Sequence, residues 1–218
     1  SAASDVYKRQ LLDDAHHYSL LIDDVEYISQ VRGMITVTQP EAGEIGTMRF
    51  TLQALGTALL SSITSWKAVE LVIDGDVYFG GYVISSQPAL DQDQPDGWEA
   101  IDVVVEEWAT VLARTAPVNR RYFNTDPGDI VADLFDWALD PTGSPPNQTE
   151  FDTTTYVSAG SWDGLAPTFL VDNEMISEAL DRLALLCGFV WWIDGDKKVH
   201  FHLAGDLSLI HISEPTRL

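Results

Sequence analysis

Residues 173–203 read NEMISEALDRLALLCGFVWWIDGDKKVHFHL, and this stretch decides the fold of the C-terminal half. Its first part has apolar residues at helical spacing, which predicts an amphipathic helix with one buried face. The residues of that face are Ile176, Ala179, Leu180, Leu183 and Cys187. Asp172 or Asn173 is expected to cap the start of the helix, and Gly188 to take the left-handed conformation after its last turn.

The second part predicts a β-hairpin. FVWWI (189–193) and KVHFHL (198–203) are rich in β-branched and aromatic residues, and they flank Asp194-Gly195. This dipeptide is a strong signal for a two-residue hairpin turn. Because Gly188 permits a sharp reversal, we expect the helix to pack on the hairpin that follows it.

From Tyr18 to about Val105 the apolar residues alternate, which is typical of strands with one buried face. One hairpin is expected around Asp23-Asp24, a strand over 47–53 with Met48, Phe50 and Leu52 on one face, and a second hairpin around Asp74-Gly75. A later strand carries Ile101, Val103 and Val105 on one side. Short strands separated by turns predict an antiparallel β-barrel or sandwich over residues 11–112.

Beyond this region the period becomes helical. EEWATVLAR (106–114) places Trp108, Val111 and Leu112 at helical spacing. NTDPGDIVADLFDWALDP (124–141) has a complete start and stop: Asp126 as N-cap, Pro127 at the first position, Asp129 in the first turn, an apolar stripe through Ile130, Leu134 and Ala138, and Pro141 beyond the end. Residues 143–167 show no period and predict a long irregular connection. The fold class is therefore α+β, with a smaller α+β domain over 113–206 that holds two amphipathic helices and the hairpin.

The two ends of the chain differ from the sequence between them. DVYKRQ (5–10) can be coded by GAT GTG TAT AAG AGA CAG, and the reverse complement of that string codes for LSLIHI (207–212). The ends resemble the translated adapter of a sequencing library, so residues 1–10 and 207–218 are excluded from the fold predictions. We expect the remainder to be an internal fragment, truncated at the C-terminal end of its second domain.

The chain is strongly acidic, with a formal net charge of −22. A protein that binds DNA clusters Lys and Arg on one surface, and between the excluded ends the longest basic runs are the pairs Arg120-Arg121 and Lys197-Lys198. Specific nucleic-acid binding is therefore not expected. The acidity favours solubility, as in a halophilic or marine protein, or an acidic lumen past which DNA slides. No apolar run is long enough for a membrane span, so this segment is not expected to insert in a membrane.

Few residues suggest chemistry. His200 and His202 point to one face of a strand and could chelate a metal, but a metal site wants further ligands at definite spacing. The only other histidines between the ends, His16 and His17, lie near the N-terminus. The polar face of a hairpin explains the pair more simply. Cys187 is expected to be a buried small hydrophobe, because no neighbouring base would activate it.

Other candidates are weaker. The acidic loop at 91–97 departs from a calcium loop, since Pro95 breaks its register, and Asn147 begins a glycosylation sequon that matters only in a secretory host. Glu106 and Glu107 could supply a carboxylate pair, although with 34 acidic residues such pairs arise by chance. No nucleophile elbow, zinc-protease motif, phosphate loop or paired-cysteine motif occurs. We therefore predict no catalytic residue, no cofactor, no metal site and no enzyme activity.

Seven tryptophans are expected in cores or subunit interfaces rather than in a sugar-binding platform. They are Trp66, Trp98, Trp108, Trp137, Trp162, Trp191 and Trp192. Trp191 and Trp192 are neighbours on one strand and must face opposite sides, so at least one of them needs cover from another element.

The order of these parts resembles the hub proteins of bacteriophage tail tips and baseplates. The similarity runs through residues 35–53, 69–87, 101–118, 122–135 and 176–201, and covers most of residues 18–203. Its most telling parts are the DPGDIV helix start (126–131) and the helix–hairpin unit LDRLALLCGFVWWID (180–194), which is similar to the unit in hubs of contractile tails and secretion spikes. The acidic excess and the long aromatic loop at 141–168 depart from the family pattern.

The resemblance implies a structural virion protein, made in the cytoplasm of a bacterial host. It implies a homotrimer whose barrel domains form a ring that continues the tail tube and lets DNA or the tape-measure protein pass. The implied partners are further tail proteins, such as the tail tube and the distal tail protein. Two other classes stay open: a carbohydrate-binding adhesin that uses the aromatic residues at 151–169, and a fragment of a glycan or peptidoglycan hydrolase with paired carboxylates.

Overall fold

The computed structural model of the 218-residue chain describes residues 16–38, 45–55, 62–89, 98–114, 118–138, 151–153 and 166–203. The chain divides into two compact units, Ser1–Thr110 and Val111–Leu218, here called unit 1 and unit 2. The sequence placed the domain boundary after residue 112, two residues beyond the division between unit 1 and unit 2. The domain assignment itself stays a prediction.

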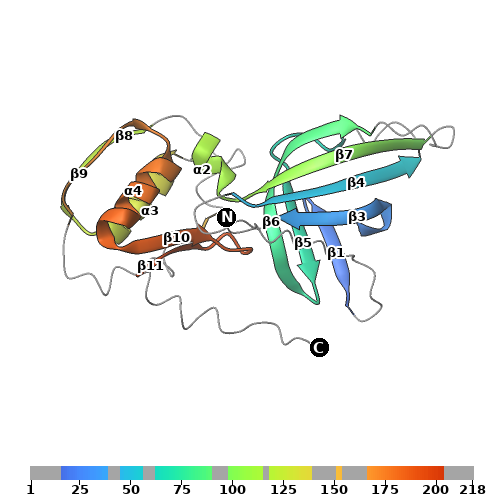
Figure 1. Ribbon diagram of the computed structural model, residues 1–218, viewed down its shortest axis with the longest axis horizontal. Coiled ribbons are helices and arrows are strands. Elements are labelled where there is room, and N and C mark those ends of the chain that lie inside the picture. Colours follow the sequence, from blue (N-terminus) through green and yellow to red (C-terminus); the bar gives the residue numbers. More distant parts are fainter. Residues whose placement is uncertain are drawn as a thin grey trace, which may run out of the picture. The chain divides into compact units, whose positions relative to one another are not determined.

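Unit 1 contains one antiparallel sheet of seven strands in the described part of the chain, in the order β2-β1-β5-β6-β7-β4-β3. The strands are β1 (Tyr18–Ile22), β2 (Val25–Glu26), β3 (Val31–Thr38), β4 (Thr47–Leu55), β5 (Ala68–Ile73), β6 (Asp76–Pro88) and β7 (Trp98–Glu107). The sheet is curled, with β1 and β5 turning away from β4 and β7 (Figure 1). Along β1 and β4, buried apolar residues alternate with more exposed residues, so the buried side chains of these strands line one face of the sheet.

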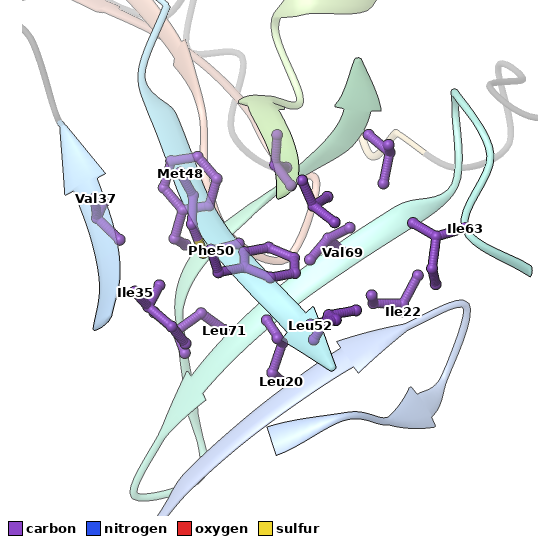
Figure 2. Packing of buried hydrophobic residues seen from close by; sticks show 14 of the residues in the cluster. Leu20, Ile22, Ile35, Val37, Met48, Phe50, Leu52, Ile63, Val69 and Leu71 are labelled. Carbon is purple, nitrogen blue, oxygen red and sulfur yellow. The ribbon is translucent and has the colours of Figure 1, made fainter. Parts of the chain in front are cut away.

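The core of unit 1 lies inside this curl. Met48, Phe50 and Leu52 of β4 are 0%, 4% and 0% exposed, which confirms the face predicted for that strand. Figure 2 shows these side chains directed to the same interior as Val69 and Leu71 of β5. Full burial of one such side chain stabilises the fold by about 1.5–3 kcal/mol.

The two edges of the sheet are joined by a short segment. The 3₁₀ helix η1 (Ile28–Gln30) connects β2 to β3, which are the edge strands, and it contacts both β1 and β4. The segment between the two edge strands therefore also contacts the strand next to each edge, β1 beside β2 and β4 beside β3. No ladder joins β2 to β3 within the described residues, so closure into a barrel stays a prediction.

Two tight turns connect strands of unit 1. Asp23-Asp24 have φ angles of 46° and 63°, and Asp74-Gly75 have φ angles of 55° and 96°. In each case the flanking residues pair directly, Ile22 with Val25 and Ile73 with Asp76. Positive φ at both central residues matches the right-handed twist of the strands, and Asp and Gly tolerate it.

In unit 2, two helices lie with two β-ribbons (Figure 1). After α2 (Thr110–Arg114), the elements are β8 (Val118–Thr125), α3 (Pro127–Ala138), β9 (Ala166–Glu174), α4 (Ile176–Cys187), β10 (Phe189–Ile193) and β11 (Val199–Leu203). The antiparallel pairs are β8 with β9 and β10 with β11. Helix α4 contacts β9, β10 and α3, so it links both ribbons.

Helix α3 begins as predicted. The side chain of Asp126 accepts the N–H of Gly128 at 2.8 Å, and its carbonyl accepts the N–H of Ile130 at 3.1 Å. Ile130 and Leu134 are fully buried. The N-cap and first-turn carboxylates also face the positive end of the helix dipole.

The start of α4 differs from the prediction. β9 continues through Asp172 and Asn173 to Glu174, so neither Asp172 nor Asn173 caps the helix. Met175 occupies the N-cap position, and its N–H donates to the carboxylate of Glu178 at 3.0 Å. The end of the helix is as predicted, because Gly188 has φ 71° and its N–H bonds the carbonyl of Ala184.

The turn between β10 and β11 also differs. The prediction placed a two-residue turn at Asp194-Gly195, but the N–H of Lys197 bonds the carbonyl of Asp194 at 3.0 Å, and the positive φ lies at Lys197 (62°). Ile193 pairs with Val199. The Asp194 side chain explains the longer loop, because it accepts the N–H groups of Asp196 and Lys198 and so organises the turn.

Candidate functional site

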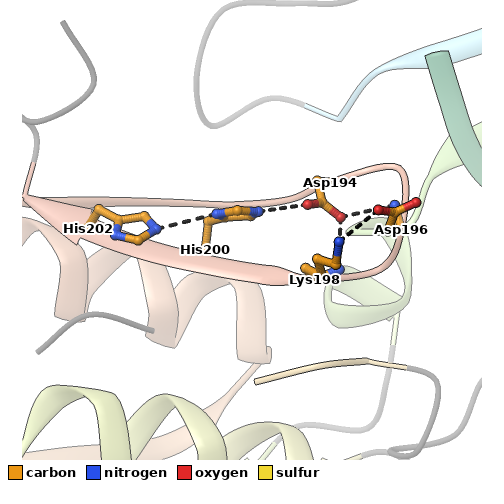
Figure 3. A network of polar contacts seen from close by, with 5 residues as sticks. All are labelled: Asp194, Asp196, Lys198, His200 and His202. Atoms are coloured by element: carbon orange, nitrogen blue, oxygen red, sulfur yellow. Dashed lines mark hydrogen bonds and ion pairs between the residues drawn. The ribbon is translucent and has the colours of Figure 1, made fainter. Parts of the chain in front are cut away.

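The clearest polar cluster in the described residues lies on the β10–β11 ribbon. Val199 and Phe201 are fully buried on one side of β11, which leaves His200 and His202 on the other side. The two imidazoles face each other, with Nδ1 of His200 at 3.3 Å from Nε2 of His202 (Figure 3). The sequence had predicted this shared face from the alternation of residues.

Asp194 holds one end of the cluster. Its Oδ2 lies 2.8 Å from Nε2 of His200, while its Oδ1 accepts the N–H groups of Asp196 and Lys198 at 3.0 and 2.9 Å. The hydrogen bonds from the loop backbone therefore fix the Asp194 carboxylate in the position from which it contacts His200. Figure 3 shows the continuous line from Asp194 through His200 to His202.

Trp192 covers His200 from the neighbouring strand. The two residues are cross-strand partners, and their rings stack with centroids 4.5 Å apart and planes inclined by 2°. Trp191 faces the opposite side, where its Nε1 donates to Asp181 of α4 at 2.7 Å. The two tryptophans thus take opposite sides of the ribbon, and each has a partner.

Glu106 and Glu107, which the sequence offered as a possible carboxylate pair, have different hydrogen-bond partners. Glu106 accepts the hydroxyl of Thr110 at 2.5 Å, whereas Glu107 accepts the N–H of Gly46 at 2.9 Å. Burial raises the pKa of Glu107, and the Gly46 hydrogen bond opposes this shift. Glu106 therefore stabilises the start of α2, and Glu107 holds the backbone before β4.

The aromatic residues considered for sugar stacking are buried against other side chains, where the structure describes them. Phe151 is 6% exposed and packs against Phe135 at 5.8 Å, and Phe169 is 1% exposed beneath the guanidinium of Arg182. Trp108 is also buried, with its ring 4.8 Å from that of Tyr82. The side chains of Trp137 and Trp162 lie outside the described residues.

Cys187 is buried at the end of α4, as predicted. Burial, together with the negative charge of Asp126, raises the pKa of its thiol to about 11. A thiol with such a pKa is protonated at neutral pH and is a poor nucleophile.

The remaining candidates fall elsewhere. His16 lies beside the carboxylate of Asp74 at the tip of the β5–β6 hairpin. The acidic loop at 91–97 and the sequon at Asn147 lie outside the described residues. In the described part of the chain, no group of three or more His, Cys, Asp or Glu side chains is placed to hold a metal ion.

One cluster in unit 2 could not be predicted from the sequence. Arg182 of α4 donates to the carbonyl of Leu170 at 2.5 Å, pairs with Glu174, and lies 4.3 Å over the ring of Phe169. All three partners belong to β9, a strand that the sequence did not predict. An arginine on the polar side of a predicted helix gives no hint of such a contact.

Several large apolar side chains stay exposed on each unit. In unit 2, Phe123 and Leu170 lie on the outer face of the β8–β9 ribbon, and Leu185 and Leu186 lie on α4. Their exposed fractions are 61%, 44%, 84% and 54%. In unit 1 the exposed set is Val25, Met34, Leu55, Tyr78 and Trp98. Such residues are candidates for contacts with other chains. Among the described residues, no helix has the length and apolar character that a membrane crossing requires.

Comparisons with known proteins connect this fold to phage tails. The sequence matches no protein-family model, and no curated protein matches it significantly. Among solved structures, the 43 kDa tail protein of prophage MuSo2 from Shewanella oneidensis aligns with a TM-score of 0.61 and 16% identity, over 86% of this chain and 53% of that one. A tail protein from Neisseria meningitidis MC58 aligns with a TM-score of 0.52 and 13% identity, over 85% and 50%.

A chain of the lidded Francisella PdpA–VgrG complex aligns with a TM-score of 0.50 and 11% identity, over 94% of this chain and 31% of that one. The present chain therefore spans about half the length of the two tail proteins, and less of the third. At these identities the likeness concerns the fold. This chain has the fold of phage tail proteins, in agreement with the hub-protein resemblance of its sequence.

Proposed function

We propose that the chain is a structural, non-catalytic component of a phage tail tip or baseplate hub. The observation that carries the proposal is the fold shared with the MuSo2 tail protein over 86% of this chain, at a TM-score of 0.61. The two parts most telling in the sequence, the start of α3 and the α4–β10–β11 unit, both lie in the second unit of this fold. The protein would act in the virion, after synthesis in the host cytoplasm.

The proposed assembly is a homotrimer whose curled sheets close into barrels and line a ring. The link through η1 between the two edge strands supports closure, since a sheet with joined edges has little freedom to flatten. Exposed Phe123, Leu170, Leu185 and Leu186 offer apolar area for a closed symmetric interface. The remaining partners would be the tail tube, the distal tail protein and the tape measure.

A ring of this protein would let DNA pass without holding it. The formal net charge of −22 means that a lumen lined by this chain repels a polyanion. The role needs no catalytic group, and the separate engagements of Glu106 and Glu107 fit that requirement.

The test is the solution mass of the chain with negative-stain imaging. The full chain and residues 11–206 are purified in parallel, and both are expected to give three copies per particle with an annular outline. The shorter form controls for the ends that resemble an adapter, whose removal is expected to leave the stoichiometry unchanged. A monomer at every concentration tested would contradict the ring.

The two other classes predict different results. An adhesin would bind defined sugars on a glycan array, but Phe151 and Phe169, two of the aromatic residues expected to stack on a sugar, are buried. A hydrolase would turn over peptidoglycan and lose activity on Glu106→Gln or Glu107→Gln. We expect neither glycan binding nor turnover.

A further inference from the structure

We propose that His200 and His202 form a chelate for one divalent late transition metal ion of the Zn²⁺, Ni²⁺ or Cu²⁺ class. The site lies on the side of the β10–β11 ribbon opposite the Trp191–Asp181 contact with α4. A bound ion would hold the two histidine side chains on this face, in addition to the backbone ladder that joins β10 to β11. This inference is independent of the proposed tail function.

Strand register places the two donors together. Val190 pairs with His202 and Trp192 with His200, so both histidines project from the same side of an antiparallel ladder. The opposite side of β11 carries Val199 and Phe201, which are fully buried. Residues two apart on a strand share a face, so the two histidines lie side by side on the face opposite Val199 and Phe201.

The separation of the two nitrogens matches a chelate. Nδ1 of His200 lies 3.3 Å from Nε2 of His202. Imidazole nitrogens bind Zn²⁺ at about 2.0–2.1 Å, and two such ligands at a tetrahedral angle are about 3.3 Å apart. The separation of the two nitrogens therefore suits one shared ion, once both lone pairs turn toward it.

Asp194 prepares His200 for this role. Its Oδ2 lies 2.8 Å from Nε2 of His200, and Oδ1 is occupied by two backbone N–H groups. A carboxylate accepts, so the Nε2 of a neutral His200 carries the proton and Nδ1 presents its lone pair to His202. A carboxylate that orients a histidine ligand in this way is a recurring feature of metal sites.

The rings are also held in place before binding. The plane of His200 stacks on Trp192 at 2°, and the His200 side chain is only 14% exposed. Fixed ligands lose little rotamer freedom when an ion binds. Without metal, the Nε2–H of His202 donates to Nδ1 of His200; on binding, that proton moves to Nδ1 of His202, so no net proton is released.

The donor set selects the class of ion. Imidazole suits Zn²⁺, Ni²⁺ and Cu²⁺, and their affinities for nitrogen ligands are highest for Cu²⁺, whereas Mg²⁺ and Ca²⁺ prefer oxygen ligands. Two protein donors fill half of a tetrahedral shell. Water or an added ligand completes it, because no third His, Cys, Asp or Glu side chain joins the pair among the described residues.

The test is calorimetric titration of the full chain, freed of metal by a chelator, with Zn²⁺ and then Ni²⁺. We expect one ion per chain, and a loss of affinity of at least tenfold in His202→Gln. Asp194→Asn is expected to weaken binding about 10–100-fold, because its amide N–H would face Nε2 of His200 and drive the proton to Nδ1. The Asn carbonyl can still accept the Asp196 and Lys198 N–H groups, so the loop is retained.

The control replaces the other histidines, His16, His17 and His211, by Gln, and is expected to bind like the wild type. An independent readout is long-range ¹H–¹⁵N NMR of the wild-type rings, where Zn²⁺ is expected to shift Nδ1 of His200 and Nε2 of His202. Unshifted nitrogens in the presence of excess Zn²⁺ would overturn the proposal. Equal affinity of the wild type and His202→Gln would overturn it as well.

Discussion

Two neighbouring glycines of β6 show how single residues permit close packing in unit 1. A Cβ atom on Gly81 would lie 2.0 Å from the carbonyl oxygen of Glu106 on β7, and one on Gly80 would lie 2.3 Å from Nε1 of Trp108. The first contact is with the backbone of the adjacent strand, which cannot move aside without breaking the ladder. The glycines therefore allow a closer approach than any other residue would.

We predict that Gly81→Ala lowers the free energy of unfolding by about 2–3 kcal/mol, the upper part of the range for overpacking. Urea unfolding monitored by circular dichroism measures it. Gly33→Ala is the matched control, because Gly33 has φ 77° but has nothing within 4 Å of an added Cβ. The control is expected to cost about 1–2 kcal/mol, from the left-handed backbone alone, and a loss in Gly81→Ala no larger than in Gly33→Ala would contradict the steric argument.

Two glutamates of unit 1 are expected to give opposite pH dependence. Burial raises the folded-state pKa of Glu107, so its stabilising contribution is full below the unfolded pKa and is lost as the pH rises through the folded pKa. Burial also opposes ionisation of Glu26, but hydrogen bonds from the backbone N–H groups of Ile28, Leu20 and Tyr27 and from the Ser19 side chain together outweigh burial and lower the pKa of Glu26. Its contribution is present above the unfolded pKa and is lost as the pH falls.

The measurement is urea unfolding of Glu107→Gln and Glu26→Gln between pH 4 and pH 8. Relative to the wild type, Glu107→Gln is expected to gain stability as the pH rises, because it no longer buries a charge. Glu26→Gln is expected to lose stability relative to the wild type over the same rise. Parallel pH profiles for the two variants would show that the local contacts do not set these pKa shifts.

At the scale of elements, Arg182 fastens α4 to β9. Its guanidinium bonds the Leu170 carbonyl, pairs with Glu174 and covers the ring of Phe169. Lysine keeps the charge but lacks the planar fork that serves several acceptors at once. We therefore predict that Arg182→Lys lowers the free energy of unfolding by about 1–2 kcal/mol.

Thermal and urea unfolding measure this effect, with Arg49→Lys as the control. Arg49 is exposed on β4, so its replacement is expected to change stability by less than about 0.5 kcal/mol. A loss in Arg182→Lys no larger than in the control would mean that the charge alone holds β9 to α4.

The sequence predicted the elements whose information is local. Asp126 and Pro127 mark the start of α3, Gly188 ends α4, and alternation identifies the buried face of β4. β9 was missed because its pairing with β8 joins residues about 50 positions apart. The same strand removed Asn173 from its predicted role as a cap.

The candidate site follows the same division. The shared face of His200 and His202 could be predicted from a period of two, but their distance depends on the loop that Asp194 organises. The side-chain hydrogen bonds of Asp194 select a loop with positive φ at Lys197, and a dipeptide signal alone does not contain them.

At the scale of the whole molecule, charge opposes the assembly proposed for this chain. Copies with a formal charge of −22 repel one another, while exposed apolar residues favour association. Raising NaCl from about 0.1 to 1 M shortens the screening length from about 10 to 3 Å. The oligomer fraction is therefore expected to rise with salt at a fixed chain concentration.

Analytical ultracentrifugation at the two salt concentrations measures that fraction. Replacing Asp24, Asp76 and Asp136, which are exposed, by Asn removes three negative charges and is expected to raise the oligomer fraction at low salt in the same direction. Dissociation at high salt would instead mean that ion pairs join the copies. Because Arg and Lys are scarce in this chain, we expect its interfaces to depend on apolar contact, and the charge to set only the threshold concentration for assembly.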